Sequence, residues 1–289
     1  MTLSELYQKV RRSLMEKEDA ESAAFIARQL LCKITGRTRE QFLTDRQMYV
    51  SDEAFTAAEG FVKRILADEP LAYVLGEWEF YGMTLMVTPS VLIPRDDTCA
   101  VTDLAIQQAL YLGENPRILD LCTGSGCIGL AIASRVNDAK VTLADISRDA
   151  LQVARKNISA QKLSARVSCV QVNALEEPPG FLGKFDLIVS NPPYITTREM
   201  RELPRSVAVF EPRLALHGGE DGLEFYRSIT EKYRSALKPG GYLCFEFGMG
   251  QGDAVCALLE DNGFTILERS RDYNERERAV IARYDRKEA

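Results

Sequence analysis

The sequence is poor in the residue patterns that bind metal ions. It contains one histidine, His217, and its seven cysteines include no CxxC pair. A zinc site needs three or four His, Cys or carboxylate ligands brought close together. We therefore expect no metal site, and we expect the cysteines to be reduced, mostly buried thiols.

The chain also lacks long apolar runs and a surplus of basic residues. No stretch approaches the roughly 18 apolar residues of a membrane span, and residues 1–20 lack the apolar centre of a secretion signal. The net charge is −6, with 11 Lys and Arg against 14 Asp and Glu in residues 1–90 and 25 against 28 in the rest. These features indicate a cytoplasmic protein without the positive surface that follows a nucleic-acid backbone.

The first part of the chain reads as helical. Apolar residues recur there at three- and four-residue spacing, which is the pattern of amphipathic helices. Pro70 is expected to end this helical block. Two short β-rich runs on either side of Tyr81-Gly82 then predict a hairpin. The helical pattern covers residues 3–15, 19–34 and 52–69.

From Pro116 onward, short apolar runs alternate with amphipathic ones. This alternation is typical of an α/β domain whose mostly parallel sheet is covered by helices on both faces. The last two runs, 264–270 and 277–284, have no helix between them and predict an antiparallel pair at the edge of the sheet. Because 289 residues exceed a usual single domain, we expect three parts: a helical domain 1–75, a hairpin connector 76–95 and a catalytic domain 96–289.

A glycine-rich loop, DLCTGSGCIG (residues 120–129), lies between the first predicted strand of this α/β part and its helix. Gly124 and Gly126 let the backbone approach a ligand, while the helix start offers free N–H groups. Asp145 ends the next strand about 20 residues later, where an acid can accept both hydroxyl hydrogens of a ribose. Loop and acid predict an adenosine-type cofactor, either a dinucleotide or S-adenosylmethionine.

Three other interpretations of these residues stay open. Together with Gly129 the loop matches the fingerprint GxGxxG, so a Rossmann dehydrogenase is one alternative. A glycine turn without a ligand is another. Asp145 alone fits equally well as the cap of the following helix.

The segment NPPY (residues 191–194) follows the fourth predicted strand, at the edge where ligands of parallel sheets bind. A planar amide or aromatic amine nitrogen is a poor nucleophile, so an enzyme that methylates it must hold it in place. The Asn191 side-chain oxygen and the Pro192 carbonyl can accept the two N–H bonds of an –NH₂ group. Pro193 stiffens the loop, and Tyr194 can lie flat over the planar group. The segment favours a methyltransferase over a dehydrogenase, and its plain alternative is a proline-rich turn with a buried tyrosine.

Over nearly its whole length the chain resembles the release-factor glutamine methyltransferases (PrmC/HemK type), a branch of the class I S-adenosylmethionine-dependent methyltransferases. The resemblance implies a Rossmann-like seven-stranded domain preceded by a small helical domain, which binds the release factor, and a β-hairpin connector. It also implies methyl transfer from S-adenosylmethionine to the side-chain nitrogen, N(5), of the glutamine in the Gly-Gly-Gln motif of bacterial peptide-chain release factors. The matching segments are PLAYVLGEWEFYG, VLIPRDDT, ILDLCTGSGCIGLAIA, FDLIVSNPPYI, FEPRLAL, DGLEFYRSI and RDYNERERAVIARY.

The resemblance assigns roles position by position, with S-adenosylhomocysteine as the product and no metal. Asp145 would hold the ribose and Asn173 the adenine. Asn191, Pro192 and Tyr194 would be catalytic, Asn191 also contacting the cofactor, and Pro193 would join them in binding the substrate glutamine. The cofactor loop would be Cys122, Thr123, Gly124, Ser125 and Gly126, and departures from the family pattern occur at Cys122, where glycine is usual, and at Asp96, Cys99 and Ala174.

Several alternatives remain for the substrate and for two acidic residues. An adenine-amine methyltransferase acting on DNA or RNA would present the same –NH₂ group, but the acidic charge disfavours it. Methylation of a ribosomal-protein glutamine is a nearer variant, and cofactor binding without catalysis is a non-enzymatic one. We expect Glu211 and Glu246 to make loop or sheet hydrogen bonds rather than act as catalytic bases. The expected protein is a monomer whose partners are release factors, without direct contact to nucleic acid or membrane.

Overall fold

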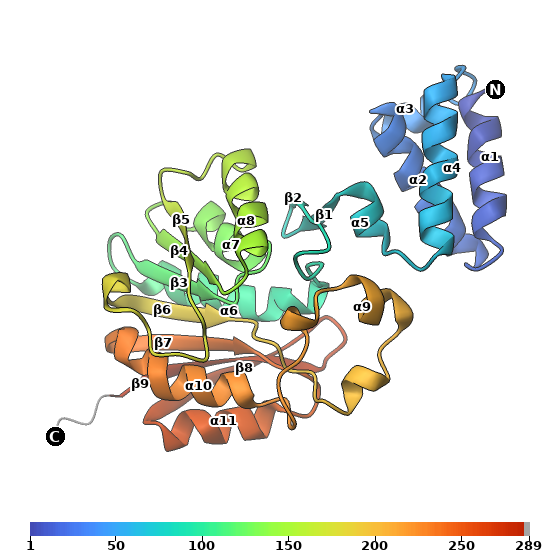
Figure 1. Ribbon diagram of the computed structural model, residues 1–289. Helices are drawn as coiled ribbons and strands as arrows, with labels where there is room; N and C mark the ends of the chain where they lie inside the picture. Colours follow the sequence, from blue (N-terminus) through green and yellow to red (C-terminus); the bar gives the residue numbers. More distant parts are fainter. Residues whose placement is uncertain (286–289) are drawn as a thin grey trace. The chain divides into compact units, whose positions relative to one another are not determined.

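The computed structural model describes residues 1–285 of the chain, which form two compact units (Figure 1). The first unit comprises residues 1–76 together with 205–210, and the second comprises residues 77–204 together with those from 211 onward. The first is helical, and the second contains all the strands. Among the described residues, no helix is long and apolar enough to cross a membrane.

Most helices of the first unit are amphipathic and bury one apolar face. Leu6 of the first helix, Leu30 of the second and Ala58 of the fourth are fully buried in one shared core. The three-to-four-residue spacing of such residues is what the sequence pattern indicated, and the three predicted helices are confirmed to within three residues at each end. The helices are α1 (Leu3–Leu14), α2 (Ala20–Thr35), α3 (Arg39–Thr44), α4 (Asp52–Leu66), α5 (Leu71–Leu75) and α9 (Arg205–Phe210).

Three short helices of this unit, α3, α5 and α9, lie outside the predicted segments. Thr38 is the N-cap residue of α3. Its hydroxyl accepts from the Gln41 N–H, and the Gln41 side chain accepts from the Thr38 N–H. The α5 helix begins directly after Pro70, so the expectation that Pro70 ends the helical block is wrong. Proline is tolerated at a helix start because the N–H it lacks would have no intrahelical partner there.

The second unit begins with the hairpin expected around Tyr81-Gly82. Strands β1 (Glu77–Phe80) and β2 (Met83–Met86) pair antiparallel, with Phe80 opposite Met83. Both turn residues have positive φ, 54° at Tyr81 and 76° at Gly82, as a two-residue type I′ turn requires. The predicted hairpin is confirmed.

A seven-stranded sheet forms the centre of the second unit, in the order β5-β4-β3-β6-β7-β9-β8. Strands β3 to β7 run parallel, and β9 pairs antiparallel with both β7 and β8. The predicted parallel sheet with an antiparallel pair at its edge is therefore confirmed. The strands are β3 (Arg117–Leu121), β4 (Lys140–Asp145), β5 (Val167–Gln171), β6 (Phe185–Ser190), β7 (Leu237–Glu246), β8 (Phe264–Arg271) and β9 (Glu277–Tyr284).

Helices cover both faces of this sheet (Figure 1). Successive strand residues alternate between the faces, so Ile118 of β3 packs in one core cluster while Leu119 packs in the other. One cluster holds residues of α6 (Cys99–Tyr111), α7 (Cys127–Arg135) and α8 (Arg148–Ala160), and the other holds residues of α10 (Glu224–Lys232) and α11 (Gly252–Asp261). Short 3₁₀ turns occur at η1 (Asp96–Thr98), η2 (Gly180–Leu182), η3 (Glu199–Arg201), η4 (Arg213–Ala215) and η5 (Tyr233–Ala236).

The seven cysteines all carry free thiols. Cys244 and Cys256 are buried, whereas the other five are half-buried. The expectation of mostly buried thiols is therefore wrong for those five, because they lie near helix ends, in a loop and on the outer strand β5, where the core ends.

One buried amide joins the hairpin to the glycine-rich loop. Asn157 of α8 is 1% exposed, and its Oδ1 accepts from the Met86 N–H at 2.7 Å. Its Nδ2 donates to the Met86 carbonyl at 3.1 Å and to the Ser125 carbonyl at 2.9 Å. A single side chain therefore fixes the end of β2 against the loop that follows β3.

Replacing this amide tests how much the link contributes to stability. Asn157→Leu removes all three hydrogen bonds and leaves the backbone groups of Met86 and Ser125 without these partners. We expect the free energy of unfolding to fall by about 2–4 kcal/mol, measured by urea denaturation. The exposed neighbour Lys156 provides the control, because Lys156→Ala should change it by less than about 0.5 kcal/mol. Equal losses in the two variants would contradict the assigned role of Asn157.

Candidate active site

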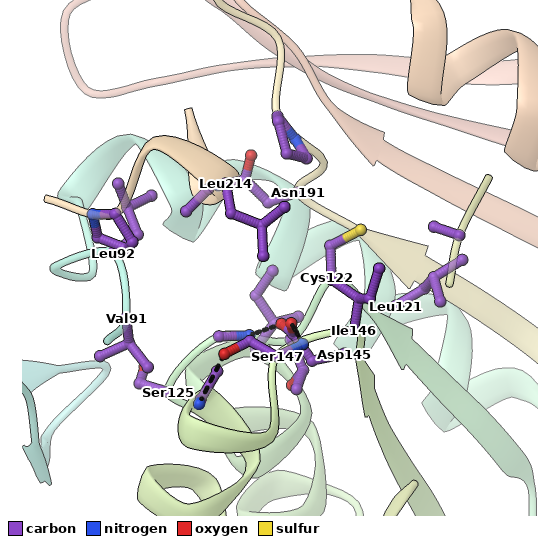
Figure 2. Close-up of a pocket in the computed structure, with 18 of the residues that line it drawn as sticks. Val91, Leu92, Leu121, Cys122, Ser125, Asp145, Ile146, Ser147, Asn191 and Leu214 are labelled. Atoms are coloured by element: carbon purple, nitrogen blue, oxygen red, sulfur yellow. Dashed lines mark hydrogen bonds between the residues drawn. The ribbon is translucent and has the colours of Figure 1, made fainter. Parts of the chain in front are cut away.

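A pocket opens at the carboxyl ends of strands β3, β4, β5 and β6 (Figure 2). Parallel sheets place the loops that follow their strands at one edge, so segments far apart in the sequence meet there. Gly126, Pro192 and Tyr194 are not among its lining residues. The predicted site residues that do line it are Cys122, Thr123, Gly124, Ser125, Asp145, Asn173, Asn191 and Pro193.

A buried carboxylate, Asp120, holds the glycine-rich loop in shape. It is fully buried at the end of β3, and its Oδ2 accepts from the Thr123 hydroxyl at 2.6 Å and from the Gly129 N–H at 2.9 Å. Burial raises the pKa of Asp120 to about 7, although these two hydrogen bonds oppose the rise. Sequence reasoning gave Asp120 no role, although an acid directly before a glycine loop is a usable signal.

The glycines after this loop serve packing as well as backbone conformation. Gly126 begins α7 with φ of 86°, a conformation that side chains rarely adopt. A Cβ at Gly129 would collide with the Leu143 side chain and approach the Asp120 carboxylate. The GxGxxG spacing is thus accounted for by the close approach of α7 to β4, and Gly129 does not line the pocket.

Cys122 occupies a backbone position that favours glycine. Its φ is 62°, in the left-handed region. The resemblance leads us to expect glycine at this position, and a positive φ is the conformation that glycine adopts most readily. The Cys122 side chain lies on the pocket wall (Figure 2), and burial raises the pKa of its thiol far above the usual range.

Asp145 ends β4 with its carboxylate at the pocket. Its Oδ2 accepts from the Gly124 N–H and its Oδ1 from the Ser147 N–H, each at 2.9 Å (Figure 2). Each oxygen keeps a second lone pair with which it can accept a ligand hydroxyl. Burial raises the pKa of Asp145 against these backbone hydrogen bonds. The α8 helix is capped by Ser147, which accepts from the Ala150 N–H, so the alternative of Asp145 as the cap is wrong.

Asn173, expected beside an adenine, lines the pocket but uses its side chain locally. Its Oδ1 accepts from the Leu175 N–H at 3.0 Å, and its Nδ2 donates to the Glu176 carboxylate at 2.9 Å. These bonds fix the turn after β5. Its assignment to the adenine stays a prediction.

The NPPY segment leaves β6 with Asn191 and Pro193 on the pocket wall. Tyr194 lies behind that wall, packed against the core on the side of α10 and α11. The Tyr194 carbonyl accepts from the Gln251 side chain at 3.1 Å, and a Cβ at Gly222 would collide with the same carbonyl. The loop is therefore held tightly from behind, and the roles expected for Pro192 and Tyr194 stay predictions.

A part of the pocket that sequence reasoning missed comes from two segments joined by Glu211. The Glu211 side chain is 1% exposed, accepts from the Ile93 N–H at 3.3 Å and pairs with Arg95. This confirms the expectation of a loop hydrogen-bonding role for Glu211. VLIPRDDT and FEPRLAL supported the resemblance without an assigned contact. They contribute the lining residues Val91, Leu92, Pro94, Thr98, Pro212, Leu214 and Ala215.

The described residues 1–285 contain no cluster of three His, Cys, Asp or Glu side chains that could hold a metal ion. His217 instead shares a hydrogen bond of 2.9 Å with the Thr197 hydroxyl. The pocket presents the Asp145 carboxylate and the Asn191 amide between apolar walls.

Comparison with known proteins identifies relatives of both parts of the chain. The PrmC N-terminal domain matches residues 5–76, and the methyltransferase small domain matches residues 102–207. A methyltransferase structure from Pyrococcus furiosus is 18% identical with a TM-score of 0.51, covering 78% of this chain and 98% of that one, which is a likeness of fold alone.

Two curated relatives align over most of the chain. A release factor glutamine methyltransferase of Clostridium acetobutylicum is 36% identical over 253 residues, which is 88% of each chain. One of Geobacter sulfurreducens is 38% identical over 272 residues, covering 94% of this chain and 93% of the relative. With such identity across both units, and with the glycine loop, Asp145 and Asn191 at one pocket, the chain belongs to the family of release factor glutamine methyltransferases.

Proposed function

We propose that this protein transfers a methyl group from S-adenosylmethionine to the side-chain nitrogen, N(5), of the glutamine in the Gly-Gly-Gln motif of bacterial peptide-chain release factors. The observation that carries the proposal is the position of Asn191 on the same pocket as the glycine loop and Asp145. An amide acceptor therefore lies next to a site suited to an adenosine-type cofactor. The substrate is taken from the relatives, which are release factor glutamine methyltransferases.

The pocket residues fit S-adenosylmethionine. Beside its bonds to the Gly124 and Ser147 N–H groups, Asp145 keeps lone pairs for the two ribose hydroxyls. Val172 and Ala174 give an apolar wall for an adenine ring. When bound, S-adenosylmethionine supplies an electrophilic methyl group and becomes S-adenosylhomocysteine. The set of donors and acceptors requires no metal ion.

The residues after β6 would hold the nitrogen that is methylated. The Asn191 Oδ1 and the Pro192 carbonyl accept the two N–H bonds of the glutamine amide, which fixes the plane of the –NH₂ group. The adjoining prolines stiffen the loop, and Tyr194 supports it from behind. The proton that the methylated nitrogen loses can leave to water after transfer, so none of these residues acts as a base.

The first test is direct methylation of a protein substrate. Incubation with S-adenosylmethionine and a bacterial release factor should add one methyl group, located on the Gly-Gly-Gln glutamine by peptide mass spectrometry. A release factor whose target glutamine is replaced by alanine is the control and should gain no mass. Methylation of adenine in DNA or RNA with the release factor unchanged would contradict the proposal.

The second test addresses Asn191. Asn191→Ala removes an acceptor that acts on the nucleophile, so kcat should fall about 10²- to 10³-fold. The dissociation constant for S-adenosylmethionine, measured by calorimetry, should change by no more than about twofold. The exposed loop residue Asn137 serves as the control, with Asn137→Ala active. An unchanged kcat in Asn191→Ala would remove this residue from its role.

We further propose that residues 1–75 bind the release factor, with 76–95 as the connector and 96–289 as the catalytic domain. What supports this role is a group of exposed apolar side chains beside α3: Leu43 is 48% exposed, Met48 51% and Tyr49 81%. Exposed apolar side chains in one short stretch are typical of a surface that meets a protein partner.

Tyr49→Ala tests this surface. The KM for the release factor should rise about 5- to 10-fold, because a large aromatic contact is lost, while the KM for S-adenosylmethionine stays unchanged. Tyr111, 87% exposed at the end of α6 in the second unit, provides a matched control. If Tyr111→Ala and Tyr49→Ala had the same KM for the release factor, the assigned surface would be wrong.

A further inference from the structure

A carboxyl group is buried beside the proposed acceptor Asn191. The parallel pair β6 and β7 places Ser190 opposite Phe245, so the residues that follow them, Asn191 and Glu246, are neighbours. Glu246 ends β7 and is 1% exposed. Its backbone is fixed, because its carbonyl accepts from the Tyr226 hydroxyl at 2.9 Å and it pairs with Ala279 of β9. Within residues 1–285 its Oε2 has no hydrogen-bond partner. Burying a carboxylate without a full set of partners costs free energy, so its position calls for a functional reason.

Two donor side chains, those of Thr98 and Asn191, act on the pKa of this carboxyl group. The Asn191 Nδ2 donates to the Thr98 hydroxyl oxygen at 3.4 Å, and Thr98 is 2% exposed. The Thr98 hydroxyl and the Asn191 amide both lower the pKa of Glu246 as hydrogen-bond donors. No hydrogen bond is formed at Asn191 Oδ1 within the described part of the chain.

The donor-to-acceptor direction of the hydrogen bonds among Asn191, Thr98 and Glu246 determines which end of the Asn191 amide is free. An ionised carboxylate only accepts hydrogen bonds, so the Thr98 hydroxyl directs its hydrogen to Glu246. The Thr98 oxygen then offers a lone pair, which suits the Nδ2 end of Asn191 and not its Oδ1 end. The oxygen is thereby left free to accept from a substrate –NH₂ group.

We propose that Glu246 is a positioning residue that acts on Asn191 both directly and through Thr98, and so orients the Asn191 side chain as a hydrogen-bond acceptor for the substrate amide. This inference rests on the proposed function. Glu246 touches no reacting atom. Its role is to prevent a 180° rotation of the Asn191 side-chain amide. Such a rotation would place the Nδ2 donor of Asn191 against the –NH₂ group of the substrate, which is itself only a donor.

Protonation of Glu246 should reverse the direction of the hydrogen bonds that connect it with Thr98 and Asn191. A protonated carboxyl donates to the Thr98 oxygen, and the Thr98 hydrogen then becomes available to Asn191 Oδ1. Burial raises the pKa of Glu246 to about 7, with Asp97 adding to the rise and Arg278 opposing it. The other groups that interact with it are Tyr194, Tyr226, Cys99 and Cys127, whose own pKa values are raised above the usual range and which stay neutral near pH 7.

The pH dependence therefore has a defined sign. Glu246 is ionised above its pKa, so kcat should be highest on the alkaline side and should fall as pH decreases through about 7. Measurement at saturating S-adenosylmethionine separates this effect from protonation of Asp120, which acts on the cofactor loop.

The experiment compares the full-length wild type with Glu246→Gln and Thr98→Val. Both variants should lower kcat at alkaline pH by about 10- to 100-fold, because the Asn191 side-chain amide is no longer fixed in a single orientation. The dissociation constant for S-adenosylmethionine should stay within about twofold of the wild-type value. In Glu246→Gln the loss of activity through neutral pH should disappear, since glutamine does not titrate.

The control is Glu260→Gln, which neutralises an exposed carboxylate on α11 and should keep the wild-type kcat and pH profile. A kcat for Glu246→Gln within about twofold of wild type would overturn the inference. So would a kcat of Glu246→Gln that decreases toward acidic pH in the same way as that of the wild type. If Glu246→Gln fails to fold in a thermal melt, the kcat of Thr98→Val decides in the same way. A wild type that does not methylate release factor would instead refute the proposed function, so the two failures are distinguishable.

Discussion

The arrangement of the pocket depends on buried carboxyl groups that accept hydrogen bonds from the loops around them. Asp120 accepts from the glycine loop at Thr123 and from the start of α7 at Gly129. Glu211 joins the segment containing Ile93 to the one that follows α9. A buried carboxylate stays in place only while its donors do, so each such group specifies a single loop geometry. The walls of the pocket are consequently fixed by polar contacts, although most of the surface that they present is apolar.

Much of the fold could be predicted from periodicity. The strands are short and apolar and the helices are amphipathic, so their positions and the two-sided sheet followed from the pattern. The short helices α3 and α5 could not be found in this way, because five or six residues are too few to establish a period. Pro70 was misjudged for a local reason: a proline that ends one helix can equally begin the next. The thiols were misjudged because composition does not reveal how far a cysteine lies from the centre of the core.

The site could be predicted only where its residues follow strands. Asp145 ends one parallel strand and Asn191 directly follows another, and the carboxyl ends of these strands share one edge of the sheet. The wall formed by Leu92 and Leu214 has no such rule, since it depends on the contact of Glu211 with Ile93, which lie 118 residues apart. Gly129 has a sequence signal that does not correspond to its role in the structure. It matches a ligand-binding fingerprint, yet it is required by the packing of α7 on β4.

The choice between glutamine and adenine requires features beyond the NPPY loop. Both groups present a planar –NH₂ with two N–H bonds, and an acceptor such as Asn191 would hold either one. The net charge of −6 disfavours a polyanionic substrate, because phosphates would be repelled before a base could reach the pocket. The exposed apolar side chains beside α3, such as Tyr49, are better matched to a protein surface. In the proposed function, the carboxyl edge of the sheet therefore determines the reaction, whereas charge and surface outside the pocket determine which molecule carries the amide.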